Sequence, residues 1–182
     1  MSIQAFQERP AAGAAEGLLV LHHGRGADEH DLLALAGVLD PGRALHVVAP
    51  RAPLTLPGSP GHHWYLVPRV GHPDQDTFHA AFAALAGFHD ALWERTGLGP
   101  EQTILGGFSM GAVMSYSLGL ASSRPRPAGV LPSPASCRTS PAGSPTSPGA
   151  SACRCSSPTA ARTRSSRSIS RAAPARRSRP VA

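Results

Sequence analysis

Three short apolar runs, each followed by a segment with helical periodicity, organise the first 120 residues of the chain. The runs are GLLVLH at residues 17–22, LHVVA at 45–49 and TILGGF at 103–108. Continuous apolar runs of this length, bounded by glycine or proline, are typical of parallel strands that are buried on both faces. We therefore predict three buried strands.

The segments after these runs predict helices, because their apolar residues recur at the spacing of one helix face. Asp28 is a candidate N-cap of the first helix, which Pro41-Gly42 ends and whose apolar face is Leu32, Leu35, Ala36 and Leu39. The second helix is predicted from Asp76 to about Arg95, with a face of Phe78, Phe82, Leu85, His89 and Leu92. The third is predicted from Gly111 to Leu120.

Strands that alternate with helices predict an α/β fold, in which helices cover both faces of a parallel sheet. Residues 50–75 are rich in Pro, Gly and His and are predicted to form a long loop. Loops of that length inside a domain commonly line a site or move.

The composition changes at about Val130. Beyond it Pro, Ser, Ala, Arg and Thr dominate, aliphatic residues are scarce and aromatic ones are absent. Such a segment cannot bury enough apolar surface to offset its chain entropy. We therefore divide the chain into residues 1–130, an α/β domain, and residues 131–182, predicted to be disordered.

Charge divides the chain at almost the same place. Six Arg oppose eleven acidic residues before Arg124, whereas from Arg124 onward there are eleven Arg and no acid. The net charge of +6 thus averages two different compositions. A basic tail could bind nucleic acid or an acidic surface in a salt-dependent way, so a non-catalytic binding protein is the alternative from another class. Because no aromatic residue lies among these Arg residues, we expect no specific nucleic-acid partner.

The remaining composition excludes several classes. The three cysteines, Cys137, Cys153 and Cys155, lack the spacing of a disulfide framework or a zinc site. The sequence shows no signal peptide and no apolar run of about 20 residues, as a membrane span requires. We expect a cytoplasmic protein without a membrane span, metal or cofactor; the oligomeric state is not predicted.

The candidate nucleophile is Ser109, in the sequence Gly107-Phe108-Ser109-Met110-Gly111. This G-x-S-x-G pattern lies between a predicted strand and a predicted helix, where a sharp turn exposes the serine and requires small neighbours. The turn also directs the amide of Met110 at the carbonyl oxygen under attack.

The second candidate element is the loop HHGRGADE after the first strand. A loop in this position can supply the other backbone amide of an oxyanion hole. We expect His23 and Gly24 to form this loop and the amide of Arg25 to be the donor.

Together LVLHHGRGADEHDLL, VVAPRAP, Trp64 and ILGGFSMGA resemble the phospholipase/carboxylesterase family of α/β-hydrolases, which includes relatives of the acyl-protein thioesterases. The resemblance covers roughly residues 15–130. It implies an α/β-hydrolase fold, here incomplete toward the C-terminus, and hydrolysis of esters, lysophospholipids or acyl thioesters through an acyl-serine. It also implies that Trp64 lies near the substrate mouth, although packing in the core is an equal alternative.

The catalytic triad of this fold follows the order Ser, Asp or Glu, His. After Ser109 the sequence contains no Asp, Glu or His. A serine needs a base to take its proton, so we expect the chain to be nearly inactive. A neighbouring His22 or His23 is the weaker alternative as a base, and a non-catalytic domain that binds esters is a third possibility.

A shifted reading frame would account for the tail. One permitted back-translation from Leu131, read two bases later, contains HGRADPVI, which resembles the family segment that bears the catalytic Asp. That Asp would be encoded across the codons of Arg162 and Thr163, and the His beyond Ala182. The hypothesis is therefore a family esterase whose residues 131–182 are out of frame.

Overall fold

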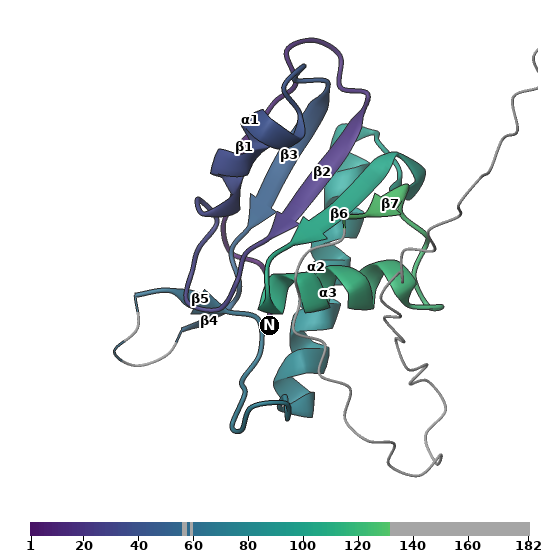
Figure 1. Cartoon of the computed structure of the whole chain (residues 1–182). Helices are drawn as coiled ribbons and strands as arrows, with labels where there is room; N and C mark the ends of the chain where they lie inside the picture. The colour runs from purple at the N-terminus through teal and green to yellow at the C-terminus, as the bar shows by residue number, and fades with distance from the viewer. Residues whose placement is uncertain (56–57, 59, 132–182) are drawn as a thin grey trace, which may run out of the picture. The chain divides into compact units, whose positions relative to one another are not determined.

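A five-stranded sheet is the frame on which the rest of the described chain is built (Figure 1). Its order is β1-β3-β2-β6-β7, and all neighbouring pairs are parallel except β1 with β3. The strands are β1 (Phe6–Arg9), β2 (Gly17–His22), β3 (Leu45–Pro50), β6 (Thr103–Gly107) and β7 (Gly129–Val130). The three predicted strands are confirmed within one residue, and so is the α/β fold.

The computed structural model describes residues 1–55, 58 and 60–131. The segment 131–182, predicted to be disordered, lies outside the described residues except for Leu131. Leu131 continues the line of β7, because its amide donates to the carbonyl of Leu105 in β6 at 2.8 Å.

The sheet is covered on both faces, as alternating side chains of β2 demonstrate. All six β2 residues are buried, and successive side chains of a strand point to opposite faces. Leu18 and Val20 pack in a core with α2 (Gln75–Thr96) and α3 (Met110–Leu120). Leu19 and Leu21 pack in a second core under the helical segment 32–39 (Figure 1).

The long helix α2 begins and ends close to its predicted bounds. Its N-cap is Asp74, whose carboxylate accepts a hydrogen bond from the amide of Thr77 at 2.9 Å. It ends at Gly97, whose φ of 71° is the left-handed conformation that glycine adopts without strain. Leu85, His89 and Leu92 of the predicted face are buried, and Phe78 and Phe82 pack at its edge.

The first predicted helix differs from expectation. It consists of a 3₁₀ turn, η1 (Leu32–Leu35), followed by one turn of α-helix, α1 (Ala36–Leu39). Leu32 and Ala36 are buried against the sheet and Leu33 packs beside them, whereas Leu35 and Leu39 remain 48% and 45% exposed. Asp28 is not the N-cap, because its carboxylate accepts the amide of His30 in the preceding turn.

The predicted loop 50–75 contains a small second sheet. β4 (Leu54–Thr55) pairs with β5 (His62–His63) in antiparallel fashion. A bridge between Ala27 and His62 ties this hairpin to the loop after β2. The only other short element is a 3₁₀ turn before β6, η2 (Pro100–Gln102), among the residues that the structure describes. None of the described helices is both long and apolar enough to cross a bilayer.

Candidate active site

Ser109 lies in a sharp turn between the end of β6 and the start of α3. Its φ of 51° and ψ of −113° lie outside the conformations that non-glycine residues ordinarily adopt. The turn is held by two backbone bonds: Phe108 donates to the carbonyl of His22 at 3.1 Å, and Gly111 donates to the carbonyl of Phe108 at 2.9 Å. Such strain persists only where the surrounding structure enforces it, and it is typical of functional sites.

The two flanking glycines are required by close packing rather than by their own dihedral angles. A methyl group on Gly107 would lie 2.6 Å from the carbonyl of Gly111. A methyl group on Gly111 would overlap the carbonyl oxygens of His22 and His23 at the end of β2. The first turn of α3 can therefore reach the strand end only with glycine at 111.

The loop that follows β2 is anchored at three places. The ring of His23 accepts the amide of Ala52 at 3.0 Å, which leaves its other nitrogen to donate to the carbonyl of Gly24 at 2.8 Å. Gly26 donates to the carbonyl of His62 at 2.9 Å, and His62 donates to that of Ala27 at 2.8 Å.

The third anchor is the ion pair between Glu29 and Arg51, just beyond β3. Nε of Arg51 donates to Glu29 at 2.6 Å, and a second guanidinium nitrogen contacts the other carboxylate oxygen. These bonds lower the pKa of the buried Glu29 to about 2. A two-point pair of this kind fixes orientation as well as distance.

The two backbone amides that the sequence analysis predicts as oxyanion donors have no hydrogen-bond partner among the described residues. Gly24 packs against Phe108, the residue before Ser109, since a methyl group there would come within 3.0 Å of the phenyl ring. Within the described part of the chain, no hydrogen bond uses the amide of Arg25 or Met110, or the hydroxyl of Ser109. The loop and the turn thus lie side by side with two amides and a hydroxyl unpaired.

A buried chain of hydrogen bonds lies behind the turn, and no pattern in the sequence predicts it. His22 Nδ1 lies 2.7 Å from Ser115 Oγ, and its Nε2 lies 3.3 Å from His89 Nε2. Ser115 donates to the carbonyl of Gly106 or Gly111, at 2.8 and 3.0 Å. Because Ser115 donates there, we assign the Nδ1 proton to His22 and the Nε2 proton to His89.

The imidazoles of His22 and His89 in this hydrogen-bonded chain are both neutral near pH 7. Burial lowers the pKa of His89 to about 4, with a further contribution from the charge of Arg124. Burial and the neighbouring His89 lower the pKa of His22 well below its ordinary value. Desolvation disfavours a charged imidazole, so both rings serve as fixed neutral supports.

Neither His22 nor His23 is available as a base for Ser109. Both ring nitrogens of each residue are already hydrogen-bonded, and each side chain is at most 1% exposed. The alternative in which one of them replaces the triad histidine therefore has no support in the geometry.

Trp64 is fully buried beneath the loop that follows β2. Its indole nitrogen donates to the carbonyl of His23 at 2.8 Å, and its ring packs against His22 and His23. Of the two interpretations of Trp64, these contacts support core packing.

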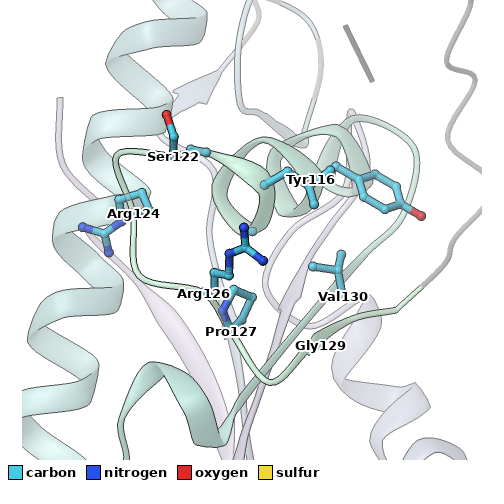
Figure 2. A pocket seen from close by; sticks show the side chains of 10 residues that line it. Tyr116, Ser122, Arg124, Arg126, Pro127, Gly129 and Val130 are labelled. Carbon is cyan, nitrogen blue, oxygen red and sulfur yellow. The ribbon is translucent and has the colours of Figure 1, made fainter. Parts of the chain in front are cut away.

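A pocket in the described part of the chain, shown in Figure 2, is lined by residues other than Ser109. It has a volume of about 670 Å³ and lies between the last turn of α3 and β7. Arg124 on its rim is engaged with Asp90 at 2.6 Å. No residue of the predicted site lines this pocket, so we do not place the chemistry there. The described residues also contain no cluster of His, Cys, Asp and Glu that could hold a metal ion.

Comparison with known proteins relates the chain to one family. The family model described as phospholipase/carboxylesterase matches residues 7–152. No curated protein matches the chain.

Several solved structures are similar. The crystal structure of the esterase PE8 is 38% identical, with a TM-score of 0.58 over 66% of this chain and 59% of that one. A carboxylesterase from Mesorhizobium loti is 29% identical, with a TM-score of 0.55 over 62% of this chain and 53% of that one. The Bacillus cereus carboxylesterase shares the fold at 24% identity, with a TM-score of 0.56 over 63% and 52%. The chain thus spans between half and three fifths of the length of these proteins.

Two Gly→Ala substitutions should have opposite effects. G111A is expected to destabilise the protein by about 3 kcal/mol or more, because its methyl group meets backbone atoms that cannot move aside. G87A, at an exposed position of α2 with nothing within 4 Å, should stabilise it by about 0.5–1 kcal/mol through helix propensity. Urea unfolding measures both, and an unchanged midpoint for G111A would contradict the packing described above.

The free energy of unfolding should fall as the pH drops from about 6.5 toward 4. His89 takes up a proton near its ordinary pKa of 6.5 in the unfolded chain but only near 4 when folded, so the unfolded state binds more protons between these values. The loss due to His89 at pH 5 is about 2 kcal/mol. Urea unfolding at pH 7.5, 6 and 5 measures it.

The matched variants are H89Q and H79Q, both in α2. H89Q should be less stable overall but should depend less on pH, whereas H79Q, at an exposed position, should retain the full dependence. Equal pH dependence of H89Q and the unmodified chain would refute this assignment.

Proposed function

Because the chain belongs to the phospholipase/carboxylesterase family, we propose that Ser109 is the nucleophile of a carboxylic ester hydrolase. The observation that carries the proposal is the turn itself. Ser109 has a positive φ between two glycines that admit no methyl group, directly beside the loop that bears Arg25. The proposal is supported further by the absence, within the described residues, of any hydrogen bond to the amides of Arg25 and Met110 or the hydroxyl of Ser109.

In the proposed reaction the Ser109 oxygen attacks the carbonyl carbon of an ester or thioester. The amides of Arg25 and Met110 donate to the oxyanion that forms, and stabilise it most when its charge is largest. The tetrahedral intermediate collapses by breaking the bond to the alcohol or thiol, which leaves with a proton. Water then attacks the acyl-serine, releases the carboxylic acid and restores the hydroxyl.

The proposed substrates are small carboxylic esters, lysophospholipids or acyl thioesters. Support comes from the family match and from similarity to proteins whose structures are described as esterases and carboxylesterases. A cytoplasmic location stays a prediction.

We expect little turnover from the chain as its sequence stands. Both proton transfers need a base, and after Ser109 the sequence offers neither a His nor an acid to orient one. The upstream His22 and His23 are fully engaged elsewhere. Enzymes that lose triad members keep about 10³–10⁴-fold catalysis over water, from the oxyanion hole and binding.

The out-of-frame interpretation of residues 131–182 explains this deficit, and we retain it as a proposal. It rests on the abrupt loss of acidic residues and on the family-like string in the shifted frame. Residues 132–182 lie outside the described part of the chain, so the support is from sequence.

Labelling of Ser109 tests the nucleophile. A fluorophosphonate probe should modify Ser109 slowly, and peptide mass spectrometry should locate the adduct there. S109A should abolish the adduct, whereas S122A, at an exposed serine after α3, should leave it unchanged. Rapid labelling, at the rate of an esterase with a complete triad, would contradict the expected lack of a base.

Restoring the reading frame tests the origin of the tail. The gene sequence across the codons of Val130 and Leu131 should reveal a shifted frame, and the repaired chain should hydrolyse p-nitrophenyl butyrate at least about 10³-fold faster than this one. A native open frame that encodes LPSPASC in related genes as well would refute the shift.

A further inference from the structure

A small pocket beside the oxyanion loop combines an unpaired cation with an unpaired imidazole. It has a volume of about 200 Å³ and is lined by Arg25, His63 and the segment Tyr65–Pro68. Sites for whole ligands commonly occupy about 300–1,000 Å³. The pocket is therefore of a size to hold one group of a larger molecule.

His63 is the unusual residue of this pocket. Its side chain is 2% exposed, yet neither ring nitrogen has a hydrogen-bond partner among the residues that the structure describes. An unsatisfied buried polar group costs about 1–3 kcal/mol, and proteins rarely leave one unpaired without a reason. Burial, and then the charge of Arg25, lower the pKa of His63, so the ring is a neutral donor rather than a second cation.

Arg25 is the complementary residue. It is exposed and forms no ion pair or hydrogen bond within the described part of the chain. Other arginines of the domain are paired, among them Arg9 with Asp40, Arg51 with Glu29 and Arg124 with Asp90. A guanidinium presents parallel donors that match a carboxylate.

The pocket is connected to the turn of Ser109 through the backbone. Gly24 packs on Phe108, and the next residue is Arg25. Gly26 and Ala27 exchange hydrogen bonds with His62, the neighbour of His63. Arg25 thus lines the pocket and directly follows the glycine that packs against the turn of Ser109.

We propose that this pocket binds a carboxylate carried by the substrate, between the guanidinium of Arg25 and the ring N–H of His63. The substrate class is then the half-esters of dicarboxylic acids, in which Ser109 attacks the ester end. A single guanidinium beside a neutral imidazole matches one negative charge, and this favours a carboxylate over a doubly charged phosphate. The inference rests on the proposed function for the ester end only.

Binding to the full chain tests the pocket without any need for turnover. The probe is monomethyl glutarate, and dimethyl glutarate is its neutral match. The readout is the ¹H–¹⁵N signal of the His63 ring, identified by its loss in H63Q, at 150 mM salt. This local readout excludes binding of the anion to the basic tail.

Monomethyl glutarate should shift the His63 signal saturably and raise the pH at which the ring titrates, whereas dimethyl glutarate should do neither. R25Q should weaken the binding at least about tenfold, while R69Q removes an equal charge from the neighbouring loop and should leave it unchanged. Equal binding of the neutral diester, no effect of R25Q, or tighter binding of ethyl phosphate would each overturn the proposal.

Fluorophosphonate labelling of the same sample separates the two proposals. Labelling of Ser109 without a shift at His63 refutes the carboxylate pocket and leaves the esterase standing. A shift at His63 without labelling of Ser109 refutes the esterase, and with it the assignment of the carboxylate to an ester substrate.

Discussion

Gly111 approaches the carbonyls of His22 and His23 too closely for any side chain to fit between them, and the candidate site depends on this contact. At this contact the first turn of α3 meets the end of β2 with no room for a side chain. It fixes the position of α3 and so determines where Ser109 is lifted above the sheet. It also fixes the start of the oxyanion loop, because the same two carbonyls belong to the residues from which that loop departs. Ser109 and the loop after β2 are thus positioned by one contact rather than by two independent ones.

Sequence patterns predicted those parts of the fold whose stability comes from burial along a regular element. β2, β3 and β6 are continuous apolar runs, and α2 is long enough for its periodicity, its N-cap region and its terminal glycine to agree. The prediction of one helix with an apolar face over residues 32–39 was wrong in detail. The two short turns found there contact the sheet at too few positions to define such a face. β1 and β7 were missed, since strands of four and two residues carry no periodicity and owe their form to their neighbours.

The candidate site divides in the same way. The turn of Ser109 could be predicted because the small residues that it requires, Gly107 and Gly111, lie next to it in the sequence. The sequence does not distinguish the structural roles of the individual histidines, because these roles depend on partners far along the chain. His22 is hydrogen-bonded to Ser115 and His89, whereas the ring of His63, in a second His-His pair, has no hydrogen-bond partner within the described part of the chain. For Trp64 the sequence likewise allowed two interpretations, a position near the substrate mouth or packing in the core, and its burial under the loop supports the second.

The β1 edge of the sheet bears on how these molecules meet one another. β1 is short, and its charged residues are engaged: Glu8 with Arg95 and His46, and Arg9 with Asp40. Short edge strands with fixed charges discourage the addition of a foreign strand, which would have to displace those pairs. At its β1 side the sheet therefore disfavours edge-to-edge pairing, so the edge beyond β7 is the more favourable one for an added strand. The two edges of the sheet therefore differ in how readily they accept a further strand.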